Sequence, residues 1–197
     1  MSKVRGEYLP RMLDVLAASR PANRTLWIVE TGCLRRKEDD YRSGDGWSTL
    51  YLALWCQGKN ARLDSVDCDP AAIQTAREVL TEHGLGDLPN VVFHQRIAEE
   101  WLREWAGPID FAYLDAHPAP EQNLAEFLEV RKRLRPPALV VIDDCFELAE
   151  DRNKGRKTLE YLREQGTQGV ILRCGRMAMI PFGTFDWSGL QRLEELP

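Results

Sequence analysis

LDSVDCD at residues 63–69, IDFAYLD at 109–115 and LVVIDD at 139–144 are three short apolar runs that each end on acidic residues. A fourth run, LWIVE at 26–30, ends on a glutamate and leads into Gly32. Parallel sheets bring the carboxyl ends of several buried strands to one edge of the fold. The pattern therefore predicts a rim that carries several carboxylates, which can hold a ribose, a metal ion or both.

Short β-rich runs alternate with segments of helical spacing along most of the chain. The runs lie at about 26–30, 62–67, 90–95, 109–115 and 138–143, and the helical segments at about 8–18, 70–83, 121–134 and 155–165. This order predicts parallel strands joined by right-handed crossovers. Two last runs, Gly169–Cys174 and Met177–Phe182, are separated by so short a turn that they should form an antiparallel hairpin. We expect an α/β fold with a Rossmann-like, doubly wound sheet of seven strands, mostly parallel, with one antiparallel strand near the C-terminus.

Length and composition narrow the class of protein. The 197 residues suffice for a single domain, which we expect to have an N-terminal helical segment at 1–25 and a core at 26–183. A net charge of −5 argues against nucleic acid as a partner. No run approaches the ~20 apolar residues that cross a bilayer, and the N-terminus lacks the apolar run of a signal peptide. We expect a cytoplasmic protein with a small-molecule substrate and no membrane partner.

Cysteines and the aromatic C-terminal end add two weaker expectations. The five cysteines form no CxxC pair, which favours reduced thiols over a disulfide framework. Phe182, Phe185 and Trp187 lie close together near the C-terminus. They either pack in the core, which is the default interpretation, or cover an active site, or join two copies of the chain as a homodimer.

A glycine-containing loop follows the first predicted strand. Gly32 ends that strand, and the sequence Gly44-Asp45-Gly46-Trp47-Ser48-Thr49 precedes the next helical segment. Such a loop can pass close to a ligand and direct free helix amides at it. The phosphate-binding patterns GxGxxG and GxxxxGK[ST] are absent. The polar stretch at 34–43 is either an ordinary surface loop or a lid over the ligand.

The remaining carboxylates divide into two candidate groups. Asp67 can accept hydrogen bonds from both ribose hydroxyls of an adenosine. We favour this role over helix capping, because Asp69 already supplies the cap of the following helix. Asp115, Asp143 and Asp144 should converge from adjacent strand ends, and such a cluster needs a cation or shared protons. Oxygen ligands in that number suit Mg²⁺, Mn²⁺ or Ca²⁺. His117 is either a general base or a loop histidine that caps the next helix.

The order of these motifs resembles that of class I S-adenosylmethionine-dependent methyltransferases. It runs Glu-x-Gly…Gly-x-Ser-Thr, Val-Asp-x-Asp-Pro, Leu-Asp-x-His, Val-Val-Ile-Asp-Asp and then Lys-Gly before a helix, over residues 26–182. Within that superfamily the chain is most similar to small metal-dependent O-methyltransferases, including the catechol type and the sugar O-methyltransferases of antibiotic biosynthesis. The resemblance implies S-adenosylmethionine as cofactor and a divalent ion that binds the acceptor oxygens.

The resemblance also implies roles for individual residues. The methionine end of the cofactor is expected at Glu30, Gly32, Gly46 and Ser48, its ribose at Asp67, its adenine at Ile97 and Ala98, the metal at Asp115, Asp143 and Asp144, and catalysis at Asp115 and His117. Two departures stand out. Arg96-Ile97-Ala98 stands where many relatives carry an acid that contacts adenine. His117 is one residue closer to Asp115 than in sugar O-methyltransferases with a histidine base.

Three functions remain open at this point. The first is metal-assisted O-methylation of a small hydroxylated substrate, which the carboxylate trio favours. The second keeps S-adenosylmethionine but uses no metal. The third is a non-catalytic, Rossmann-like protein that binds a nucleotide or a protein partner, since folds outlive functions.

Overall fold

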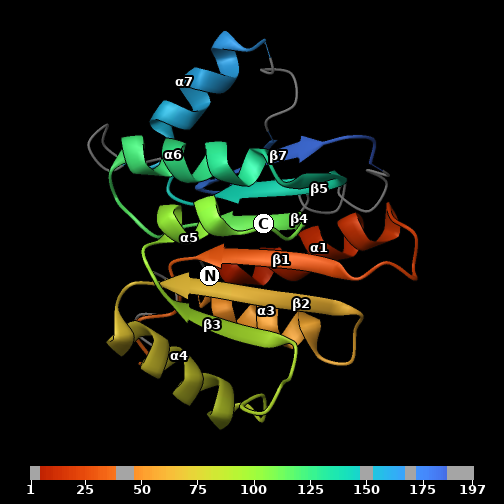
Figure 1. The fold of residues 1–197 in the computed structure, drawn as a ribbon, viewed down its shortest axis with the longest axis vertical. Helices are drawn as coiled ribbons and strands as arrows, with labels where there is room; N and C mark the ends of the chain where they lie inside the picture. The colour runs from red at the N-terminus through yellow and green to blue at the C-terminus, as the bar shows by residue number, and fades with distance from the viewer. Residues whose placement is uncertain (1–4, 39–46, 147–152, 167–171, 186–197) are drawn as a thin grey trace.

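The sheet has seven strands in the computed structural model, which describes residues 5–38, 47–146, 153–166 and 172–185. The strands are β1 (Leu26–Thr31), β2 (Ala61–Asp67), β3 (Val91–Gln95), β4 (Ile109–Leu114), β5 (Leu134–Ile142), β6 (Leu172–Cys174) and β7 (Met177–Phe182). Their order is β3-β2-β1-β4-β5-β7-β6 (Figure 1). The first five strands pair in parallel, and β7 runs antiparallel to both β5 and β6. The doubly wound, mostly parallel sheet and its reversed strand near the C-terminus are thereby confirmed.

Helices cover both faces of this sheet (Figure 1). One face carries the 3₁₀ turn η1 (Arg5–Tyr8) and helices α1 (Leu9–Ala18), α3 (Ser48–Cys56) and α4 (Pro70–Glu82). The other carries α5 (Ala98–Glu104), α6 (Pro120–Arg131) and α7 (Arg156–Glu164). Two apolar layers result, as expected for a parallel sheet that is buried on both sides. None of the described helices is long and apolar enough to span a membrane.

The boundary between α6 and β5 differs from the prediction, and the strand expected at about 138–143 begins at Leu134. The helix expected over 121–134 ends at Arg131, and Leu134 is the first residue of β5, where it pairs with Ile109 of β4. The reason lies in Pro136 and Pro137, since a residue before proline avoids the helical conformation and favours an extended one. The apolar spacing of the segment extended the predicted helix by about one turn too many. Helix α5 was not expected at all.

Asp110 joins four elements at the amino ends of the central strands. Its carboxylate is fully buried, accepts a hydrogen bond from the backbone amide of Trp27 at 2.8 Å, and forms ion pairs with Arg20 at 2.8 Å and Arg135 at 2.6 Å. Arg24 lies 3.5 Å away. Asp110 therefore connects β4 to β1, β5 and the segment after α1, on the edge of the sheet opposite the acidic rim.

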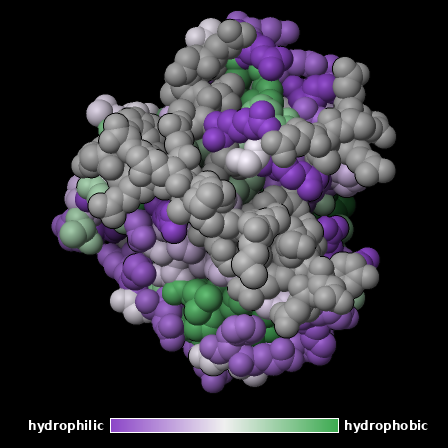
Figure 2. Space-filling view, turned by 180° about the vertical axis from the view of Figure 1, so that it is seen from behind, coloured by the Kyte–Doolittle hydropathy of each residue, from purple (hydrophilic) through white to green (hydrophobic). Residues whose placement is uncertain are grey.

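Few large hydrophobic side chains are exposed on the described part of the surface. In Figure 2, the face opposite that of Figure 1 is largely hydrophilic where it is coloured, and hydrophobic areas are small. Two large hydrophobic side chains of the described part are exposed, Leu54 at 39% and Ile97 at 51%. Cys33, Cys56, Cys68 and Cys145 are free thiols, in agreement with the expected absence of disulfides at these four positions.

Candidate active site

The loop after β1 passes unusually close to the loop after β4. Gly32 has φ +81°, and its backbone amide donates to the carbonyl of Val66 at 2.8 Å. A Cβ at this position would lie 2.8 Å from both the Cα of Ala116 and the carbonyl oxygen of Asp115. Glycine is therefore required twice, for its left-handed conformation and for the close approach of the two loops. The contact brings the ends of β1, β2 and β4 to one place.

Glu30 sits beneath this loop and is fully buried. Its carboxylate accepts hydrogen bonds from the hydroxyls of Ser48 at 2.6 Å, Thr49 at 2.9 Å and Ser65 at 2.6 Å. Burial raises its pKa to about 7, although the three hydroxyl donors act in the opposite direction. Glu30 thus positions the first turn of α3 against the sheet, while Ser48, which also lines the site, is the residue that can meet a ligand.

Two adjoining hollows open along the carboxyl ends of the strands. The first is lined by Gly32, Cys33, Arg35, Ser48, Asp67, Asp115 and Ala116. The second is lined by Val66, Asp67, Cys68, Ile97, Ala98, Glu99, Ala116, His117, Gln122 and Glu126. Asp67 and Ala116 belong to both, so the hollows form one elongated cleft. The structure therefore brings Gly32, Ser48, Asp67, Ile97 and Ala98 together, as predicted, whereas Gly46 lies outside the described residues.

Asp67 stands at the junction of the two hollows with a fixed side chain. Its carboxylate accepts hydrogen bonds from the backbone amides of Cys33 at 3.0 Å and Asp69 at 2.8 Å. Asp69 caps α4 as expected, because its side chain accepts from the amide of Ala71 at 2.9 Å. A carboxylate has about four lone-pair sites, so Asp67 keeps acceptor capacity for a ligand after these two bonds.

The second hollow contains two residues that sequence reasoning missed, both on α6. Glu126 is buried and accepts a hydrogen bond from the hydroxyl of Thr31 at 2.7 Å, and burial raises its pKa to about 7. The Oε1 atom of Gln122 is buried and has no hydrogen-bond partner among the residues that the structure describes. The two residues are four apart, so they lie on the same face of the helix. That spacing was visible in the sequence, but it did not show which face of α6 meets the strand ends.

His117 lines the second hollow rather than the first. Its Nδ1 atom accepts a hydrogen bond from the amide of Ala119 at 3.0 Å, one residue before α6 begins. This agrees with the interpretation of a loop histidine near a helix start. Asp115, the other expected catalytic residue, lines the first hollow.

Asp115, Asp143 and Asp144 converge as the sequence predicted. Each offers a carboxylate oxygen, and these atoms lie within 4.8 Å of one another. The Tyr113 hydroxyl donates to Asp143 at 2.9 Å, and Asp143 in turn accepts from the amide of Asp144 at 2.8 Å. Burial, together with the charge of Asp143, raises the pKa of Asp115 to about 7. The cluster is thus a place of high negative charge density.

Two basic side chains already face this cluster. The ammonium of Lys154 forms an ion pair with Asp115 and lies 3.5 Å from Asp144. The guanidinium of Arg176 lies 2.9 Å from the other oxygen of Asp144. The three carboxylates are close enough to share a divalent ion, but Lys154 places a positive charge among them. The described residues therefore do not fit a divalent ion without displacement of this side chain.

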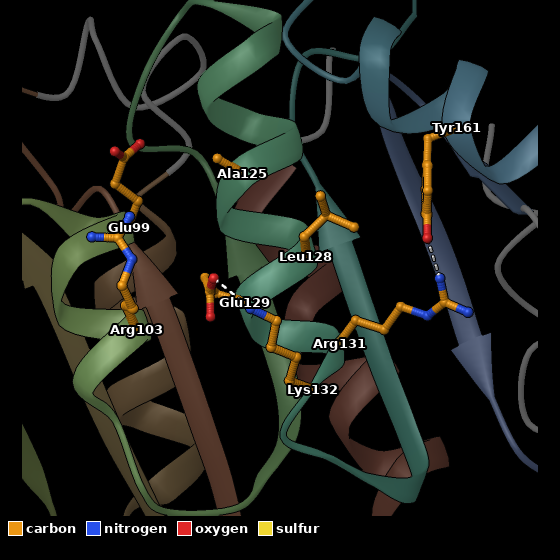
Figure 3. A pocket seen from close by; sticks show the side chains of 8 residues that line it. All are labelled: Glu99, Arg103, Ala125, Leu128, Glu129, Arg131, Lys132 and Tyr161. Atoms are coloured by element: carbon orange, nitrogen blue, oxygen red, sulfur yellow. Dashed lines mark hydrogen bonds and ion pairs between the residues drawn. The ribbon is translucent and has the colours of Figure 1, made fainter.

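A third hollow, of about 540 Å³, lies on the outer side of α5, α6 and α7 (Figure 3). Three of its charged side chains, those of Glu129, Arg131 and Lys132, are engaged in local pairs. Arg131 donates to the Tyr161 hydroxyl at 2.6 Å, and Lys132 pairs with Glu129 at 2.7 Å. Arg131 thus contributes to the contact between α6 and α7, and Lys132 to a pair with a residue of α6.

Comparison with protein families shows which family the chain matches. Residues 43–145, just over half of the chain, match the family model of a methyltransferase domain. No curated protein matches the chain.

Among solved structures, the chain resembles SAH-bound methyltransferase PaMTH1 from Podospora anserina, with a TM-score of 0.66, 16% identity, and coverage of 93% of this chain and 80% of that one. It also resembles the O-methyltransferase from Bacillus cereus in complex with SAH, with a TM-score of 0.63, 17% identity, and coverage of 92% of this chain and 82% of that one. A third similar structure is the O-methyltransferase TomG from Streptomyces achromogenes in complex with SAM, with a TM-score of 0.60, 19% identity, and coverage of 93% of this chain and 82% of that one. At such identities the likeness concerns the fold alone.

Proposed function

Since the chain belongs to the methyltransferase domain family, we propose that it transfers the methyl group of S-adenosylmethionine to a hydroxyl oxygen of a small molecule. The observation that carries the proposal is the elongated cleft, which has Asp67 at its junction and Asp115 in the wall of its first hollow. The solved O-methyltransferases with SAM or SAH support the identity of the donor.

The two hollows suit the two ends of this donor. Ile97 is half exposed in the second hollow, where an apolar side chain would gain from cover by an adenine ring. The unpaired Oε1 atom of Gln122 can accept a hydrogen bond from the adenine amino group. Asp67 would bind the ribose hydroxyls, and the amino acid end would lie along Gly32 and Ser48 in the first hollow.

When bound, S-adenosylmethionine supplies an electrophilic methyl group on a positively charged sulfur. In the transfer, an acceptor oxygen forms a bond to the methyl carbon while the carbon–sulfur bond breaks and its electron pair stays on sulfur. The hydroxyl proton of the acceptor leaves to a base. The chain's contribution is mainly to hold the two reactants in line and to exclude water, which accounts for much of the rate enhancement of such reactions.

Cofactor binding is tested by calorimetric titration of the purified chain with S-adenosylhomocysteine. We expect saturable binding, and a loss of affinity of about tenfold or more in Asp67→Ala, because a buried hydrogen bond to a charged group contributes roughly 1.5 to 3 kcal/mol. The matched control is Asp69→Ala, which removes a carboxylate two residues away that caps a helix and lines neither of the two hollows. Equal losses in both variants, or no binding heat from folded wild-type protein, would contradict the proposal.

Methyl transfer itself is tested with a panel of small phenols, catechols and sugars. The measured quantities are S-adenosylhomocysteine formed and the mass of the acceptor. An acceptor that gains one methyl group on oxygen supports the proposed function. Tight binding of S-adenosylhomocysteine without turnover of any acceptor would favour the non-catalytic alternative.

A further inference from the structure

Lys154 is the basic residue placed deepest in the acidic cluster among those described. Its side chain is 13% exposed, compared with 34% for Arg176. The ammonium pairs with the carboxylate of Asp115, lies 3.4 Å from the backbone carbonyl of the same residue, and approaches Asp144 at 3.5 Å. It thus has oxygen neighbours from the ends of both β4 and β5.

The backbone holds this lysine in place. The amide of Lys154 donates to the carbonyl of Asp144 at 3.0 Å, so the segment before α7 is tied directly to the end of β5. Gly155 follows, and a Cβ there would lie 2.1 Å from the sulfur of the buried Cys145. Only glycine permits this approach. The side chain of Lys154 therefore starts from a backbone that is packed against the cluster and does not reach it from a distant surface.

The charges of the cluster nearly balance without any added ion. The three carboxylates carry up to three negative charges, against one positive charge each on Lys154 and Arg176. Asp143 also receives hydrogen bonds from Tyr113 and from the backbone of Asp144. A divalent ion at the same place would meet the ammonium at close range, and like charges at such distances repel strongly in a partly buried site.

We infer that Lys154 is the resident cation of the acidic cluster and stands in place of a divalent metal ion. The statement about the cluster needs no assumption about activity. Its consequence for catalysis rests on the proposed function: methyl transfer in this chain proceeds without a metal. No divalent ion is then available to bind two acceptor oxygens at once, so the acceptor needs one hydroxyl and no neighbouring pair of oxygens.

The test is a titration of the full chain with Mn²⁺ alone, in which electron paramagnetic resonance measures the free ion. Wild-type protein should bind Mn²⁺ only weakly, with a dissociation constant above about 1 mM. Lys154→Met leaves the carboxylates without their ammonium, so it should bind Mn²⁺ about tenfold or more tightly than wild type. Lys154→Arg, which keeps a positive charge, should stay close to wild type.

Lys157→Met is the matched control. Lys157 lies in the first turn of α7, three residues after Lys154, but it is 38% exposed and pairs with Glu160 at 2.9 Å, so its loss should leave Mn²⁺ binding unchanged. If Lys154→Met folds poorly, Mn²⁺ should raise its melting temperature and leave that of wild type unaffected.

Two outcomes overturn the inference: tight Mn²⁺ binding by wild-type protein, or no gain in either binding or melting temperature in Lys154→Met. Because neither readout involves S-adenosylmethionine or an acceptor, these failures are distinct from a failure of the proposed function. With an acceptor identified, a chelator should leave wild-type turnover unchanged, and loss of turnover that Mg²⁺ restores would also contradict the inference.

Discussion

Glu30 shows how one side chain can be polar, buried and structural at once. The resemblance placed it at the methionine end of the cofactor, yet its carboxylate is fully buried and occupied by three hydroxyls. A carboxylate in this environment favours its protonated form, because burial disfavours the charge more than the hydroxyls stabilise it. The residue therefore affects the site through the position of α3.

A pH dependence of stability follows from this environment. Folding raises the pKa of Glu30 from 4.5 to about 7, so its contribution to stability is greatest below pH 4.5 and declines as the pH rises towards 7. Gln at this position cannot ionise. The free energy of unfolding of wild type, relative to Glu30→Gln, should therefore fall by roughly 2 to 3 kcal/mol between pH 5 and pH 8. Urea denaturation at several pH values measures the difference, and a constant difference would contradict the prediction.

The residue types at the site were predictable, but their partners were not. Gly32, Asp67 and Asp115 were expected at or just after strand ends and Ser48 just before a helix, and all four line the first hollow. The pairing of Asp115 with Lys154 spans 39 positions in the sequence, and no local pattern indicates it. A sequence can show that a cluster of carboxylates needs positive charge nearby. Whether a metal ion or a basic side chain supplies that charge depends on tertiary contacts.

At the scale of elements, the start of α4 is the clearest case of a local signal that decides the structure. Asp69 caps the helix and Pro70 occupies its first position. Asp69→Ala should reduce the free energy of unfolding by about 1 kcal/mol, because one helix amide loses its partner. Asp69→Asn, which can still accept that bond, should lose clearly less. Chemical denaturation of the two variants measures this, and equal losses would show that the charge, not the cap, matters.

Element boundaries were predictable where turn chemistry marks them and not where apolar spacing runs on. The segment at 121–134 kept a helical pattern through Leu134, although that residue belongs to β5. A buried parallel strand is apolar on both faces, so periodicity alone cannot separate its start from the end of a preceding helix. Helix α5 was missed for a different reason: its seven residues make fewer than two helical turns, too few for a periodic pattern to show.

At the scale of the whole molecule, the carboxyl and amino ends of the strands differ in function. The carboxyl edge carries the cleft, while Asp110 at the amino edge holds elements together with Arg20, Arg135 and the amide of Trp27. Its partners in β1 and β5 lie 83 and 25 positions away, so no local sequence pattern indicates the network. The alternation of strands and helices predicted the fold, but not this internal support.

Asp110→Asn should therefore lower stability with little effect on ligand affinity. Loss of the buried carboxylate leaves Arg20 and Arg135 uncompensated, which typically costs about 3 to 5 kcal/mol. The free energy of unfolding from urea titration and the affinity for S-adenosylhomocysteine should both be measured. A drop in stability with unchanged affinity in the folded fraction is expected. A tenfold weaker affinity in fully folded protein would contradict the separation of the two edges.

The two hollows that share Asp67 and Ala116 have a further consequence for affinity. A molecule that fills one hollow contacts the lining residues of that hollow alone. A molecule that spans both hollows binds as two linked fragments. Once the first fragment is seated, the second is present at a high effective concentration, which can strengthen binding by about 10² to 10⁴. Adenosine and methionine should thus be weak competitors as separate molecules, and the covalent link between them accounts for most of the discrimination in favour of the intact cofactor.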